Sequence, residues 1–63
     1  MNNNIKKLRQ ELSLTQQQLA DLVKVRRETI VFLEKGRFNP SLKLAYDISQ
    51  VFEKPIENVF VFE

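Results

Sequence analysis

The chain has 63 residues, so we expect one domain with a single small core, which buries only ~60% of the surface that the unfolded chain exposes. It contains neither cysteine nor histidine, which excludes disulfides, thiolate metal sites and the commonest general base, and we expect no cofactor. The formal net charge is +2. The charges are uneven, because residues 1–37 carry eight basic and four acidic side chains, whereas residues 38–63 carry two and four. This asymmetry favours a polyanion-binding first part and a separate role for the second part.

No apolar run approaches the ~20 residues that are needed to cross a bilayer. The first four residues, Met1 to Asn4, contain no apolar signal segment. We therefore expect a soluble, intracellular protein with no membrane partner.

The first predicted element is a helix over about residues 4–12. Its apolar side chains, Ile5, Leu8 and Leu12, recur at helical spacing and are separated by charged and amide side chains. Ser13 interrupts this pattern, so we expect the helix to end there.

A second helix is predicted over about residues 16–23. Thr15 and Gln18 match a capping box, in which the Thr oxygen accepts from the amide three residues later and the Gln reaches back. The small side chain of Ala20 would allow a neighbouring helix to approach closely.

A third helix is predicted over about residues 27–35, after a tight turn at Lys24 and Val25. Ile30 and Leu33 are expected to face the core. Gly36 follows, as is typical of a left-handed residue that ends a helix.

The fourth helix is expected over about residues 40–52, with Asn39 as its N-cap and Pro40 at its first position. Pro55 then opens a last helical turn, and the β-branched and aromatic residues 59–62 are also compatible with a short strand. The apolar residues of the fourth helix are Leu42, Leu44, Ala45, Ile48, Val51 and Phe52.

Two short helices joined by a tight turn, with a small residue early in the first, indicate a helix-turn-helix motif over about residues 16–35. In this motif the second helix enters the major groove of DNA, led by its N-terminal residues.

Three groups of residues together resemble the family of phage repressors and Cro-like proteins, also called the XRE family. They are Leu14-Thr15-Gln16-Gln17-Gln18-Leu19-Ala20, then Thr29-Ile30 with Leu33-Glu34-Lys35-Gly36, then Asn39-Pro40-Ser41-Leu42. The resemblance covers about residues 4–60. It implies an all-α fold of five helices and a homodimer that binds operator DNA in the cytoplasm or nucleoid of a prokaryotic cell. Because a dimer has two-fold symmetry, we expect an inverted-repeat operator in double-stranded DNA. We expect a repressor rather than an activator, because blocking the polymerase requires only occupancy of the DNA.

The resemblance implies that four residues of the third helix read bases: Arg26, Arg27, Glu28 and Phe32. Arg can pair with guanine through two hydrogen bonds, Glu can accept from the amino group of cytosine, and an apolar ring can contact the thymine methyl. Arg26 stands where the family often has a capping Ser or Thr, and Glu28 where it often has Gln. Phe32 is unusually apolar for a reading face, and partial packing in the core is the alternative role.

Further roles follow from the same resemblance. The residues expected to contact phosphates are Gln16, Lys35, Arg37 and Asn39. Arg9 and Glu34 match a buried ion pair that ties the first helix to the end of the third. An exposed pair that contributes ~0–1 kcal/mol is the alternative.

The C-terminal part carries more apolar side chains than so small a monomer is expected to bury. We therefore expect a dimerisation segment over about residues 51–63, formed by Val51, Phe52, Phe60, Val61 and Phe62. The alternative is that this segment folds back on its own core.

Other classes of protein are less compatible with the sequence. An enzyme is disfavoured because the chain has no His or Cys and only one Gly, which precludes a glycine-rich phosphate loop. An antitoxin that also binds DNA remains the alternative function, and a pure interaction domain is a third. No separate domain for a small-molecule effector is evident.

Overall fold

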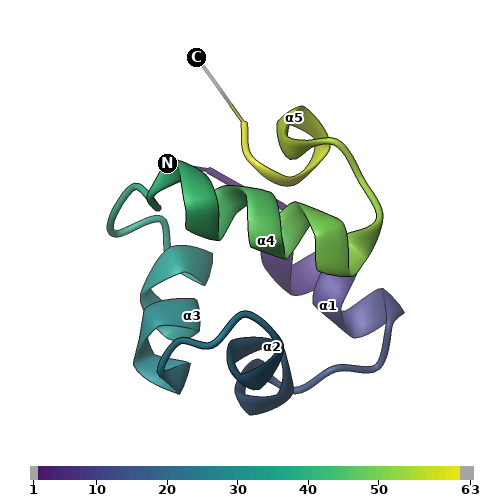
Figure 1. Cartoon of the computed structure of the whole chain (residues 1–63), viewed down its shortest axis with the longest axis vertical. Coiled ribbons are helices and arrows are strands. Elements are labelled where there is room, and N and C mark those ends of the chain that lie inside the picture. The colour runs from purple at the N-terminus through teal and green to yellow at the C-terminus, as the bar shows by residue number, and fades with distance from the viewer. Residues whose placement is uncertain (1, 62–63) are drawn as a thin grey trace.

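The computed structural model describes residues 2–61, which form five helices and no strand. The helices are α1 (Ile5–Glu11), α2 (Gln16–Leu22), α3 (Arg27–Glu34), α4 (Leu42–Phe52) and α5 (Ile56–Val59). Figure 1 shows α4 crossing in front of α1, with α2 and α3 below it and α5 above. The expected all-α, five-helix fold is confirmed.

Helices α1 to α4 are each followed by a left-handed residue. In α3 the amide of Gly36 donates to the carbonyl of Leu33, and the amide of Arg37 donates to the carbonyl of Phe32, at 2.9 and 3.0 Å. This pair of bonds is typical of the Schellman motif, which requires a left-handed residue. Gly36 has φ 70° and takes this conformation without steric cost.

The other three helices place a residue with a side chain at the left-handed position. Ser13, Lys24 and Glu53 have φ values of 57°, 60° and 55° and end α1, α2 and α4. Each carries a Cβ that crowds the backbone in this region, so these turns are strained relative to that at Gly36.

Two helix starts are capped by side-chain oxygens. Thr15 and Gln18 form the expected capping box at the start of α2. The expected start of the fourth helix is wrong, because Ser41 rather than Asn39 is the N-cap and its oxygen accepts from the amide of Leu44. Arg26 precedes α3 without any side-chain cap, because a guanidinium has no acceptor.

The core draws on all five helices and lies between α1, the α2–α3 pair and α4. Its largest side chains are fully buried: Ile5, Leu19, Ile30, Leu33, Ile48, Val59 and Phe60. Ala20, on α2, is also fully buried, and α2 packs mainly on α3. A larger residue at this position would force the two helices apart.

The two ends of the described chain are joined. Phe60 makes an isolated antiparallel bridge with Asn3, the amide of Asn4 donates to the carbonyl of Val59 at 2.7 Å, and that of Val61 donates to the carbonyl of Asn2 at 2.9 Å. The short C-terminal strand that the sequence also allowed is therefore not seen in residues 2–61. The only β-type pairing in this range is the isolated bridge between Asn3 and Phe60.

Candidate nucleic-acid interface

Helix α3 separates an inward from an outward face. Ile30 and Leu33 are buried at 0% and 1% exposure. Arg26, Arg27 and Glu28, at the N-terminal end, are all exposed. Three of the four residues expected to read bases are therefore accessible to solvent.

Phe32 is exposed to 46%, although it lies one position from buried Leu33. About half of its surface is covered by the protein, and the rest faces solvent. The ring is therefore only partly packed against the protein.

Three further expected contact residues lie in the connection between α3 and α4. Lys35 and Arg37 flank Gly36, and Asn39 follows two residues after Arg37. All three side chains are exposed. The turn at Gly36 orients this segment, because it stops α3 and reverses the chain.

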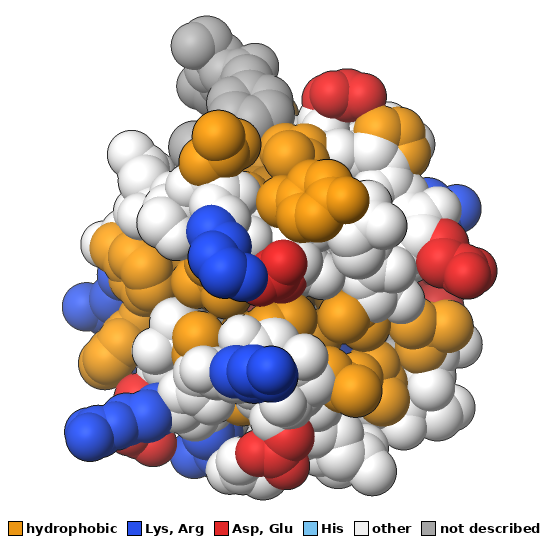
Figure 2. Space-filling model, viewed as in Figure 1, with side chains coloured by type: hydrophobic (Ala, Val, Ile, Leu, Met, Phe, Trp, Pro, Cys, Tyr) orange, Lys and Arg blue, Asp and Glu red, His pale blue; other side chains and the backbone are white. Residues whose placement is uncertain are grey.

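Basic side chains concentrate on this part of the molecule. In Figure 2 most of the Lys and Arg side chains of the visible face lie over the lower left, where Figure 1 places α2 and α3. The rest of the visible face carries fewer basic side chains among acidic, apolar and uncharged groups, and acidic side chains also lie within the lower-left region. This distribution matches the charge asymmetry of the sequence.

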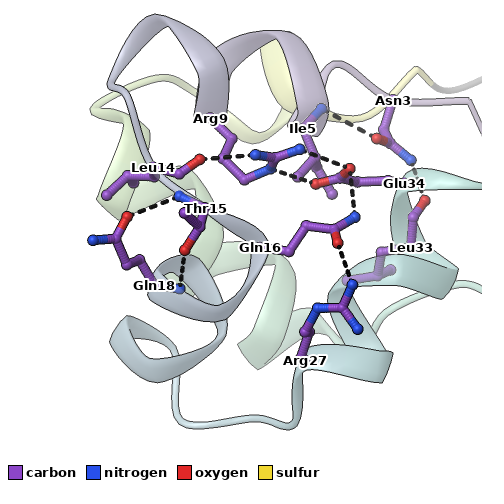
Figure 3. A network of polar contacts seen from close by, with 10 residues as sticks. All are labelled: Asn3, Ile5, Arg9, Leu14, Thr15, Gln16, Gln18, Arg27, Leu33 and Glu34. Carbon is purple, nitrogen blue, oxygen red and sulfur yellow. Dashed lines mark hydrogen bonds and ion pairs between the residues drawn. The ribbon is translucent and has the colours of Figure 1, made fainter.

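Arg9 and Glu34 form a buried ion pair behind the α3 face (Figure 3). Arg9 donates through Nε to Glu34 Oε2 at 2.8 Å and through Nη2 to Oε1 at 3.2 Å, and its Nη1 donates to the carbonyl of Leu14 at 2.8 Å. The two side chains are exposed to only 10% and 6%. The pair ties α1 and the α1–α2 corner to the last turn of α3.

Gln16, at the first position of α2, joins this pair to the outward face. Its Nε2 donates to Glu34 Oε1 at 3.2 Å, and its Oε1 accepts from Nη2 of Arg27, also at 3.2 Å. Sequence reasoning assigned Gln16 to a phosphate and missed this double contact, since 11 residues separate it from Arg27 and 18 from Glu34.

Some of the residues expected in a dimer interface are buried within the single chain, and others are exposed. Phe52 and Phe60 are exposed to 5% and 1% and belong to the core of the single chain. Val51 is partly buried, and Val61 is exposed to 41%. Phe62 lies outside the described residues.

Exposed apolar side chains occur on several elements, and two of them are on α4. Leu42 and Tyr46 are exposed to 79% and 54%, and their spacing of four residues puts them on one face of the helix. The sequence pattern did not separate Leu42 from the other apolar residues of this helix, because apolar character alone does not distinguish a core position from an unpartnered surface position.

Within residues 2–61, no group of acidic side chains is arranged to hold a metal ion. No helix in the same range is long and apolar enough to cross a membrane.

Comparison with known proteins gives consistent results. The family model described as "Helix-turn-helix" matches residues 5–59. An uncharacterized HTH-type transcriptional regulator of Archaeoglobus fulgidus is 57% identical over 63 residues, which cover all of this chain and 89% of that protein. The uncharacterized HTH-type transcriptional regulator YgzD of Bacillus subtilis is 40% identical, over all of this chain and 96% of its own length.

Two solved structures share the fold. The restriction-modification controller protein C.AhdI from Aeromonas hydrophila superposes with a TM-score of 0.80 at 25% identity, covering 89% of this chain and 85% of that one. A transcriptional regulator from Listeria innocua gives 0.81 at 23% identity, over all of this chain and 64% of that one.

The fold, the exposed arginines at the start of α3 and these relatives agree with the resemblance noted in the sequence. The chain belongs to the XRE-type, Cro- and phage-repressor-like family of helix-turn-helix proteins, which are non-enzymatic, DNA-binding transcriptional regulators.

Proposed function

We propose that this regulator is a repressor that binds an inverted-repeat operator as a homodimer, with α3 in the major groove. The observation that carries the proposal is the outward face of α3, where Arg26, Arg27, Glu28 and half of Phe32 are exposed. A helix with these exposed side chains at its N-terminal end suits direct readout of base edges.

Contacts to phosphate surround this face. Lys35, Arg37 and Asn39 are exposed beyond the C-terminal end of α3, and Gln16 lies at the N-terminus of α2. The amide nitrogen of Gln16 has two hydrogens, of which one is given to Glu34, so the second can serve a phosphate oxygen. These contacts fix position on the duplex, whereas the side chains of α3 select the sequence.

The proposed dimer uses the half of the molecule away from α3. Val61 and partly buried Val51 supply part of the expected dimerisation segment, and Leu42 and Tyr46 add exposed apolar surface on α4. Phe52 and Phe60 are buried in the core of the single chain and are not part of the proposed dimer surface. A homodimer bound to chromosomal DNA in the prokaryotic cytoplasm would repress by occupying the promoter.

The proposal is tested by selecting bound sequences from a random pool of duplex DNA. We expect two inverted half-sites whose centres lie about 34 Å, one DNA turn, apart. Affinity for the selected duplex should exceed that for a scrambled duplex, and both should fall steeply with salt because phosphate contacts release counterions. Equal affinity for every duplex at each salt concentration would exclude sequence-specific regulation.

A further inference from the structure

A groove lies between α4 and the end of α2, beside the turn that leads into α3. Its volume is about 740 Å³, within the range of small-molecule sites. In Figure 2 apolar side chains form a band across the visible face between α4 and the α2–α3 pair, with basic side chains on either side of the band. The apolar lining of the groove consists of Leu22, Val23, Val25, Leu44 and Val51.

The two walls of the groove belong to different packing units. Helix α2 packs mainly on α3, whereas α4 packs mainly on α5. Between these units, Val25, Leu44 and Val51 are only partly buried against the core, and Leu22 is exposed to 57%. The walls therefore present apolar surface that an apolar chain can cover, with a gain proportional to the area removed from water.

The groove also carries one positive charge without a partner. Lys43 Nζ donates to Asp47 Oδ2 at 2.8 Å, so these two charges balance each other. Lys24 lines the groove from the α2–α3 turn, is exposed, and forms no ion pair among residues 2–61. Apolar walls with a single unpaired ammonium complement a ligand that has an apolar chain and one anionic group.

The groove is separate from the proposed dimer surface. At 3.6 residues per turn, Leu42 and Tyr46 lie on the side of α4 away from Leu44 and Val51. A dimer formed through Leu42 and Tyr46 therefore leaves the groove open, so a second copy of the chain does not fill it. The part of α4 that lines the groove, residues 43–51, is about 12 Å long, which matches an extended chain of about ten carbons.

We propose that this groove binds a small amphipathic carboxylate, whose apolar chain lies between α2 and α4 and whose carboxylate pairs with Lys24. Lys24 and Val25 lead directly into Arg26, the residue that precedes α3, so the bound ligand contacts the turn that joins α2 to α3. The inference goes beyond DNA binding and does not depend on it, because it concerns a different surface.

The test titrates the 63-residue chain with decanoate, without DNA and below the concentration at which decanoate forms micelles. Changes in amide chemical shifts locate the binding and give the dissociation constant. We expect shifts concentrated at residues 22–25 and 43–51. Affinity should rise about twofold for each methylene from hexanoate to decanoate, because an open groove removes roughly half of the water that full burial would remove.

The charge is tested with Lys24→Gln. This variant should bind decanoate about fivefold more weakly, the scale of one exposed ion pair, and should lose the preference of the wild type for decanoate over decyltrimethylammonium. The control is Lys54→Gln, because Lys54 is also exposed and lies outside the groove. It should bind both compounds as the wild type does.

The apolar wall is tested with Leu22→Asp, which places a carboxylate in the groove and should abolish decanoate binding. Leu12→Asp is the control, since Leu12 is exposed to 51% and lies outside the groove. Because both leucines are about half exposed, both variants should keep the fold, which the amide spectra also report.

Three results would overturn the inference. They are shifts that spread over the surface or centre on Leu42 and Tyr46, equal affinity of the wild type for decanoate and decyltrimethylammonium, and conversion of a dimer to monomers in Leu22→Asp. The last result would show that a second copy covers the groove. None of them bears on the proposed DNA binding, which is measured separately.

Discussion

Arg9 and Arg27 show how the surroundings of one side-chain type separate structural from recognition roles. Arg9 is 9% exposed, makes hydrogen bonds to Glu34 and Leu14, and has no access to a ligand. Arg27 is exposed and donates one hydrogen bond to Gln16, which leaves most of its donors for a partner. The two arginines therefore differ in role because one is buried and fully engaged, whereas the other is exposed. Hydrogen bonds through Glu34 and Gln16 connect them.

Base reading and phosphate anchoring are separable by substitution. Arg27→Ala should reduce operator affinity and relax preference at one base pair, by ~1–3 kcal/mol, because a bidentate contact is lost. Lys35→Ala should weaken binding to all sequences similarly and reduce the salt slope by about one unit. Binding titrations over a range of salt measure both, and the assignment of Arg27 fails if the two variants behave alike.

The buried ion pair should dominate stability. Glu34→Ala strands the Arg9 charge at a site where water is largely excluded, which is expected to cost ~3–5 kcal/mol and to lower the melting temperature severely. The control is Asp47→Ala, which removes an exposed i,i+4 pair with Lys43, itself 85% exposed. That loss should be only ~0.5 kcal/mol. Urea denaturation measures both, and similar losses in the two variants would mean that burial adds nothing to the Arg9–Glu34 pair.

At the scale of elements, the helices are short and depend on their ends. Each of the first four stops on a left-handed residue, yet the chain has a single glycine, used at Gly36. The helices are correctly located by local signals, such as the capping box at Thr15. Substituting glycine at the strained positions Ser13, Lys24 or Glu53 should therefore stabilise the fold.

Glu53→Gly should raise the free energy of unfolding by up to about 1 kcal/mol, because it removes a Cβ from the left-handed region. Part of any gain can come from removing a negative charge near the C-terminal end of α4, so Glu53→Gln separates charge from backbone. Gln50→Gly, at an exposed position inside α4, should destabilise by about 1 kcal/mol. Thermal unfolding gives all three, and a loss of stability in Glu53→Gly would contradict the strain argument.

At the scale of the whole molecule, the proposed recognition face and the proposed dimer surface belong to different elements. The basic residues of α3 and its following loop form one region, and Leu42, Tyr46 and Val61 belong to α4 and the C-terminal segment. Such a small domain gains stability from association, and a two-fold axis would present two α3 helices to one duplex.

The dimer is tested without disturbing the core. Removing the chain after Val59 would delete Phe60, which is 1% exposed, so substitution of exposed residues is the better test. Val61→Lys and Tyr46→Lys should each shift the protein toward monomer in analytical ultracentrifugation and weaken operator binding more than binding to random DNA. Leu12→Lys, at an apolar residue of 51% exposure near the α1–α2 corner, should stay dimeric. Dimers in both interface variants at micromolar concentration would place the interface elsewhere.

The sequence by itself determined the five helices, the helix-turn-helix motif and the family, because these depend on signals within a few residues of one another. The spacing of Ile30 and Leu33, the Thr15–Gln18 box and Gly36 are such signals. The position of the α4 cap was missed by two residues, since Asn39 and Ser41 are both good N-caps and only packing selects between them.

Tertiary structure alone decided which apolar side chains are buried and which polar groups meet. Phe60 is buried because its segment pairs with residues at the other end of the chain, around Asn3, whereas Leu42 in a strongly apolar helix stays exposed. Gln16 meets Arg27 and Glu34 because α2 packs on α3. Local sequence does not encode these contacts, since each one depends on the relative placement of segments that are distant along the chain.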